Sequence, residues 1–185
     1  MMLAKEGIPF ESVRREATGE GPAPFELIGL GRIDAYIATS GTVQQLRLHA
    51  KRFVAWSVDT VAPAPAQVYI STRQALDDRP ELFANFLLGV YDALGALTAA
   101  RDLKPIIASM NQKYDIVERN SPDGGEATLA VAIDEYRPAY HDKFASNASD
   151  WKSASELMVR AGIVEAKEGL TFYTDAIRAR AFDLK

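Results

Sequence analysis

Hydrophobic positions follow two different spacings along this chain, and the change comes near residue 72. Before it, short runs rich in β-branched and aromatic residues predict strands over 12–17, 33–38, 52–58 and 67–72. Short helices are predicted between them over 2–5, 24–30 and 42–50, with Gly7 and Gly31 ending the first two. This order of strands and helices predicts an α/β arrangement of the βαβαβ kind for residues 1–58.

Beyond residue 72 the apolar residues recur at helical spacing. The longest predicted helix begins at Pro80 and carries the apolar residues Leu82, Phe83, Phe86, Leu87, Val90, Leu94 and Leu97. Further helices are predicted over 73–77, 104–115, 126–136, 151–161 and 175–182, with Gly162 as a break. Segment 126–133 also has the composition of a strand, but its acidic start and its continuation into Asp134-Glu135-Tyr136 favour a helix. The C-terminal half is therefore predicted to be rich in helix.

Composition adds constraints on the partners. The chain has 185 residues, of which 48% are hydrophobic, so it can bury a core of its own. A net charge of −4 gives no electrostatic argument for binding nucleic acid or an anionic membrane. With no cysteine, disulfides and thiolate metal sites are excluded. A small molecule or another protein is the expected partner.

The sequence shows neither an export signal nor a predicted membrane span. Residues 1–7 lack the long apolar stretch and cleavage site of a secretory signal. The apolar stretch 83–99 is interrupted by Asn85, Gly89, Tyr91 and Asp92, so no membrane span is predicted and a soluble protein is expected. The doubled Met, followed at once by the end of a helix, predicts a chain that begins inside a fold.

Motifs for catalysis are missing from the sequence. Neither of the two histidines accompanies a G-x-S-x-G turn, and His141 has no second His four residues on for a helical metal pair. The phosphate-binding patterns G-x-x-x-x-G-K-[ST] and G-x-G-x-x-G do not occur. Neighbouring carboxylates such as Asp134 and Glu135 diverge on a helix and suit a solvated face. The sequence therefore predicts a protein that is not an enzyme, with no catalytic residue, no metal ligand and no cofactor.

Ligand-binding candidates gather at two places. The tetrad Thr39, Ser40, Gly41 and Thr42 follows a predicted strand and opens a helix, where hydroxyls and backbone N–H groups can bind a polar ligand; capping by Ser40 is the alternative. The proline-bearing segment 61–66 predicts an extended crossing between two lobes. Beside it lie the further candidates Asp59, Thr60, Gln67 and Tyr69, each of which also suits a structural role. Trp56, within an apolar run, is predicted to pack in the core.

Three segments, taken in order, resemble a known family. They are Gly31-Arg32-Ile33-Asp34-Ala35, then Val68-Tyr69-Ile70-Ser71-Thr72 followed by the helix from Arg79-Pro80-Glu81 to Phe86-Leu87, and last Trp151 with Met158, Gly162 and Phe172-Tyr173-Thr174. Over nearly the whole chain they are similar to the C-terminal part of ABC-transporter solute-binding proteins of the sulfonate, nitrate or thiamine-precursor type. A complete member has a hundred or so further residues before the position of Met1.

The resemblance implies an α/β fold of the type II periplasmic-binding-protein kind, with two lobes and without its N-terminal part. By it, residues 1–58 belong to the second lobe, 59–66 cross between lobes, and 67–185 hold the return strand and closing helices of the first lobe. It implies capture of a small organic solute between the lobes for an ABC permease, in the periplasm or on the outer side of a membrane. A sensory or regulatory module of the same fold, or a small-molecule enzyme, is the alternative. Self-association through the surface left by the missing part is expected.

Overall fold

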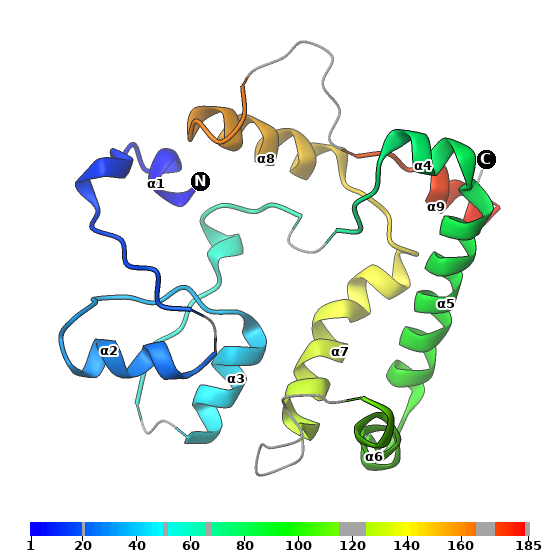
Figure 1. The fold of residues 1–185 in the computed structure, drawn as a ribbon, viewed down its shortest axis with the longest axis horizontal. Helices are drawn as coiled ribbons and strands as arrows, with labels where there is room; N and C mark the ends of the chain where they lie inside the picture. Colours follow the sequence, from blue (N-terminus) through cyan, green and yellow to red (C-terminus); the bar gives the residue numbers. More distant parts are fainter. Residues whose placement is uncertain (20, 50–51, 66–67, 115–124, 166–172, 184–185) are drawn as a thin grey trace. The chain divides into compact units, whose positions relative to one another are not determined.

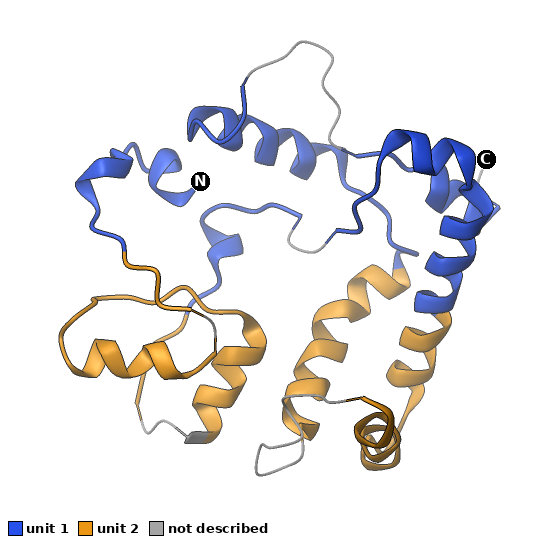
Figure 2. Cartoon of the chain, in the orientation of Figure 1, with its two compact units in different colours: residues 1–15, 56–91, 142–185 blue, residues 16–55, 92–141 orange. Residues whose placement is uncertain are grey.

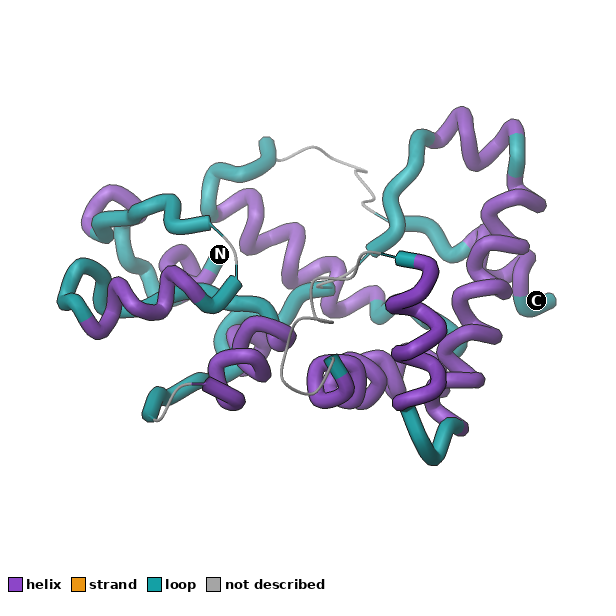
Figure 3. Tube along the Cα trace, turned by 60° about the horizontal axis from the view of Figure 1, so that its bottom comes forward, coloured by secondary structure: helices purple, strands orange, loops and turns teal. Residues whose placement is uncertain are grey.

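The structure is a computed structural model that describes residues 1–19, 21–49, 52–65, 68–114, 125–165 and 173–183 (Figure 1). Within these ranges the regular elements are all helices (Figure 3). The α-helices are α1 (Met2–Lys5), α2 (Glu26–Gly29), α3 (Ser40–His49), α4 (Arg73–Asp78), α5 (Pro80–Ala99), α6 (Lys104–Lys113), α7 (Glu126–His141), α8 (Ala148–Arg160) and α9 (Ala176–Ala181). Three short 3₁₀ turns are η1 (Phe10–Ser12), η2 (Ala23–Phe25) and η3 (Val58–Thr60).

The predicted α/β class is wrong, because the described residues contain no strand. Residues 12–17, 33–38, 52–58 and 68–72 adopt turns or irregular backbone instead. A type II periplasmic-binding fold requires a sheet in each lobe, so the fold that the family resemblance implied is overturned as well. The periplasmic-binding-protein and transport assignments depended on that fold, and they lose their basis with it.

The reason lies in what β propensity measures. Valine, isoleucine and aromatic residues favour strands because they pack well on a pleated surface whose backbone is already paired with a neighbour. Here the runs expose their large side chains, with relative exposures of 76% for Ile37, 83% for Val54 and 89% for Ile70. A segment with the composition of a strand stays irregular when no second segment supplies ladder hydrogen bonds.

Helix ends follow the local sequence closely. Gly7 and Gly162 have positive φ angles of 68° and 67°, as a residue that ends a helix in the left-handed region requires. After α8, the N–H of Ile163 donates to the carbonyl of Met158 at 2.9 Å, which closes the turn. Pro80 is the first residue of α5, as predicted. Helix α7 runs to His141 and contains Pro138, so the predicted end at Tyr136 fell short by more than a turn.

The chain forms two compact units (Figure 2). Unit 1 consists of Met1–Arg15, Trp56–Tyr91 and Asp142–Lys185, and unit 2 consists of Glu16–Ala55 and Asp92–His141. The division falls inside α5, after Tyr91. Each unit is thus assembled from segments that are distant in sequence.

Unit 1 has a small interior. Its buried apolar residues are Ala62, Ala84, Ala154 and Leu157. An aromatic group adds to these, because the Tyr91 ring centroid lies 5.0 Å from that of Phe182 and 6.0 Å from that of Phe144. Helix α1 packs against α8, and the Lys5 ammonium donates a hydrogen bond to the carbonyl of Val61. Along α5 in this unit, Ala84 is buried and the apolar side chains of Phe83, Leu87, Leu88 and Val90 are half-buried, whereas Leu82 and Phe86 are exposed.

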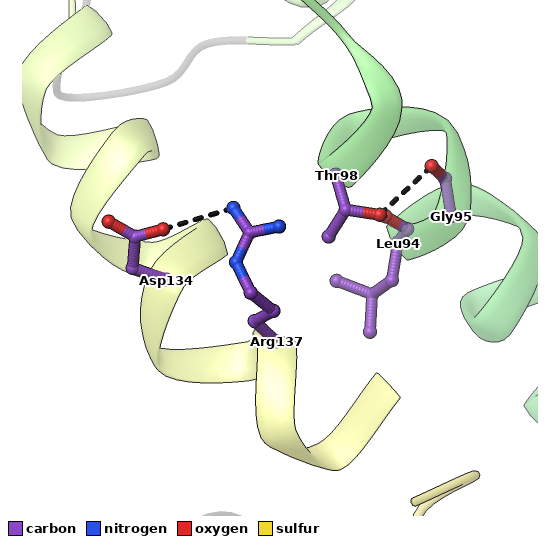
Figure 4. A network of polar contacts seen from close by, with 5 residues as sticks. All are labelled: Leu94, Gly95, Thr98, Asp134 and Arg137. Atoms are coloured by element: carbon purple, nitrogen blue, oxygen red, sulfur yellow. Dashed lines mark hydrogen bonds and ion pairs between the residues drawn. The ribbon is translucent and has the colours of Figure 1, made fainter. Parts of the chain in front are cut away.

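Unit 2 is built on the packing of α3 against α7. Leu46 of α3 and Ile133 of α7 are buried there, and the Phe25 and Phe53 rings meet edge to face at 5.5 Å. Several polar side chains on the helices satisfy their own helix rather than a neighbour. Figure 4 shows Arg137 donating to Asp134 one turn earlier on α7, at 3.1 Å, while the Thr98 hydroxyl bonds back to α5 carbonyls.

Candidate functional site

The start of α3 carries the predicted tetrad, and its hydroxyls serve the helix first. The N–H of Thr42 donates to Oγ1 of Thr39 at 3.3 Å, which is the bond that a residue before the first turn makes when it caps a helix. Thr39 Oγ1 also lies 3.2 Å from Thr42 Oγ1, and Thr42 is buried at 8% exposure. Capping therefore occurs at this turn through Thr39, one residue before the Ser40 that the sequence favoured.

Ser40 joins α3 to α7. Its hydroxyl donates to Oε2 of Glu135 at 2.7 Å, across 95 positions of sequence. Beside it, a Cβ added at Gly41 would lie 3.7 Å from Cγ2 of Thr128, so the two helices approach closely there. The Thr128 hydroxyl is buried and has no hydrogen-bond partner. The tetrad is thus part of a polar contact between two helices of unit 2.

The chemistry open to this contact is limited. A serine becomes a nucleophile when a base takes its proton, and a carboxylate that accepts a bond from an exposed serine is a weak base for that purpose. Among the described residues no group of three or more His, Asp or Glu side chains is placed to hold a metal ion. The arrangement supplies hydrogen bonds, but no activated nucleophile.

The remaining candidates lie in unit 1. Asp59 and Thr60 form η3, in which the N–H of Asp59 donates to Oγ of Ser57 at 3.2 Å and the Thr60 hydroxyl donates to the carbonyl of Ser57 at 2.8 Å. Tyr69 is 64% exposed, and its ring meets that of Phe86 edge to face at 5.1 Å. Gln67 lies outside the described residues. The structure therefore groups Asp59 with Thr60 in one turn and places Tyr69 against α5.

One expectation about an aromatic residue is wrong. Trp56 was predicted to pack in the core, and it is 68% exposed instead. Other aromatic side chains do pack. Phe144 lies against Tyr91 and Phe182 in unit 1, and the Tyr140 ring lies against Gly95 within unit 2.

Sequence analysis missed an exposed apolar surface of unit 1. We call it the α5 face, and it comprises Tyr69, Ile70, Leu82 and Phe86, with relative exposures of 64%, 89%, 55% and 49%. The signal was present in the sequence, because the apolar residues cover a wide arc of the Pro80–Ala99 helix, with Glu81, Asn85 and Asp92 confined to one narrow polar stripe. Such a helix needs cover over most of its surface, and the described residues leave the α5 face open.

Helix α5 also has the length and composition of a membrane span. It is 20 residues long, and an 18-residue stretch within it has a mean hydropathy of 1.5, with 6% of that stretch buried. The sequence had predicted no span here because of Asn85, Gly89, Tyr91 and Asp92. Length and composition by themselves are weak support, since core helices and signal sequences share them.

Comparisons with known proteins find no matching family model, no matching curated protein and no matching solved structure.

Proposed function

We propose that this chain is a non-catalytic interaction protein whose working surface is the α5 face. The observation that carries the proposal is the exposure of large apolar side chains on and beside α5. Tyr69 and Phe86 are in aromatic contact at 5.1 Å, Leu82 lies one turn before Phe86, and Ile70 follows Tyr69 in the chain. Contiguous exposed apolar surface of this kind is typical of a site that another molecule covers. Tyrosine and phenylalanine are also enriched in the centres of protein interfaces.

The free energy available is substantial. Full burial of one large apolar side chain contributes about 1.5–3 kcal/mol. Because the four residues retain between half and nine-tenths of their exposure, covering them yields on the order of 5 kcal/mol before the costs of association. That free energy is large compared with the total free energy of unfolding of an ordinary domain, so leaving the α5 face exposed to water is energetically unfavourable.

A protein suits this surface better than a lipid bilayer does. Asp92 lies in the interior of α5, and a carboxylate near the bilayer centre costs about 2.5–3.5 kcal/mol by insertion scales. The Tyr91 ring is held by Phe144 and Phe182, so that side of the helix already packs on protein. An interface with a polypeptide can hydrogen-bond Asn85 and Asp92, which hydrocarbon cannot do.

Solute capture for an importer is not part of the proposal, because it rested on the α/β fold. Catalysis is not part of the proposal either. The two hydroxyls that begin α3 are already engaged, because Thr39 accepts from the backbone N–H of Thr42 and Ser40 donates to Glu135.

Photo-crosslinking tests the proposal. A photoreactive aromatic residue at position 82 replaces an exposed apolar side chain of the α5 face, and one at Lys152, 79% exposed on α8, is the matched control. In cells that express the chain, we expect a discrete protein adduct from position 82 that Phe86→Ser removes, and none from position 152. Adducts of equal yield from both positions, adducts with lipid alone, or none at either position contradict the proposal.

A further inference from the structure

Helix α5 carries a regular seam of exposed residues. Leu82, Phe86, Gly89 and Ala93 follow one another at intervals of four, three and four, and all of them are exposed. This is the spacing at which one helix meets another along its length in a coiled-coil interface. The side chains of the seam become smaller along the helix, because the large residues Leu82 and Phe86 are followed by the small residues Gly89 and Ala93.

Gly89 has no structural explanation within the chain. It lies in the interior of α5, where glycine is less favourable than alanine because it loses more backbone entropy on folding. An added Cβ would meet nothing within 4 Å, so no close approach by a described residue requires a glycine. A hole left open on an exposed seam is what a large side chain of a partner helix can fill.

We propose that the α5 face is covered by a second copy of this chain, with the two α5 helices antiparallel. In that arrangement Phe86 inserts over Gly89 of the partner subunit, and Leu82 meets Ala93 of the partner subunit. Both pairs share one midpoint along the helix, so a single two-fold axis produces both at once. Each large residue then faces a small one, which matches the packing that helix interfaces need. This inference rests on the proposed function and specifies its partner.

Polar groups beside the seam favour the same arrangement. Asn85 and Asp92 are both exposed on α5, one position before Phe86 and Ala93 respectively. In the antiparallel pair the Asn85 amide, a donor, faces the carboxylate of Asp92 of the partner subunit, an acceptor. A parallel pair would stack Phe86 on its own copy above two empty glycine positions and would leave Asn85 and Asp92 on opposite sides of the interface. Shape and hydrogen bonding therefore favour the antiparallel register.

Light scattering on the purified chain tests the association. We expect a species of about twice the chain mass of 20.3 kDa, in equilibrium with monomer on dilution. Leu82→Ser and Gly89→Leu should each raise the dissociation constant at least tenfold. Gly89→Leu should not impair folding, because leucine is a better helix former than glycine and the site is open. Leu30→Ser, at a residue 72% exposed in unit 2, makes the same chemical change elsewhere and should leave the constant unchanged.

Cysteine pairs test the register, and the chain has no cysteine of its own to interfere. A mixture of Leu82→Cys chains and Ala93→Cys chains should form the mixed disulfide dimer under mild oxidation. Leu82→Cys chains by themselves should form little, because the two sulfurs would lie roughly eleven residues apart along the helix, about 16 Å at 1.5 Å per residue. A disulfide needs Cα atoms within about 7 Å.

Several outcomes overturn the inference. These are a chain that stays monomeric at all concentrations, a dimer indifferent to Gly89→Leu and Leu82→Ser, or efficient cross-linking of Leu82→Cys alone, which indicates a parallel pair. Transfer of the chain to neutral phosphatidylcholine vesicles, abolished by Leu82→Ser, would assign the face to lipid. A monomeric chain with a discrete heterologous adduct from position 82, lost with Phe86→Ser, overturns the second copy and leaves the proposed function standing. No protein adduct at that position defeats both.

Discussion

Two glycines in α5 allow a matched comparison, because alanine at one meets open space and at the other meets a ring. Gly89 and Gly95 both lie in the helix interior, where replacement by alanine gains about 0.8–1.0 kcal/mol of helix propensity. At Gly89 nothing lies within 4 Å of the new Cβ, so Gly89→Ala should raise the free energy of unfolding by about that amount.

Gly95→Ala should differ, since the same methyl group would lie 3.0 Å from Oη of Tyr140 and 3.4 Å from two of its ring carbons. Overpacking of this kind costs about 1–3 kcal/mol. The propensity gain offsets part of it, so we expect a net loss of up to about 2 kcal/mol for Gly95→Ala. Measured against Gly89→Ala, the difference should be about 1–3 kcal/mol.

Urea unfolding followed by far-UV circular dichroism measures both variants, at protein concentrations where the chain is monomeric. Tyr140→Phe removes the nearest atom, so a double-mutant cycle should show Gly95→Ala recovering stability in that background. If Gly95→Ala is as stabilising as Gly89→Ala, or if Tyr140→Phe leaves its effect unchanged, then Tyr140 does not pack on Gly95 and the reasoning is refuted.

Other substitutions should separate buried from exposed and capping from non-capping positions. Leu157→Ala in α8 should lower the free energy of unfolding by about 2–5 kcal/mol, because that side chain is 9% exposed. Val159→Ala on the same helix, where the side chain is 38% exposed, should lower it much less in the same urea titration. Thr39→Ala removes the cap of α3 and should lower the free energy of unfolding by about 1 kcal/mol. Ser40→Ala removes one exposed hydrogen bond to the Glu135 side chain and should lower it by about half as much. Equal effects of the two substitutions in thermal unfolding would argue against the cap. Asn147→Ala should cost about 1 kcal/mol, since its side chain accepts from the N–H of Ser149 at 2.9 Å, and Asn147→Asp should retain most of that stability by calorimetry.

The candidate site illustrates how far sequence reasoning reached. The hydroxyl-rich turn before α3 was predicted as a helix start, and Thr39 and Thr42 do close that turn. Its partner on α7 was not predictable, because Glu135 lies 95 positions away and nothing near Ser40 in sequence specifies it. The α5 face was missed for a related reason. The apolar residues of the Pro80–Ala99 helix were recognised at helical spacing, but only the surrounding structure shows which of them lack cover.

By itself the sequence determined where most helices begin and end. Proline occupies the first position of α5, and glycine with positive φ follows α1 and α8. These residues act through hydrogen bonds and steric limits within a few positions of the chain, so the local sequence is enough to predict their effect. Tertiary structure decided whether strand-like runs such as 33–38 and 68–72 became strands. A helix closes its own backbone hydrogen bonds, but a strand needs a second segment in register, and in the residues described none pairs with them.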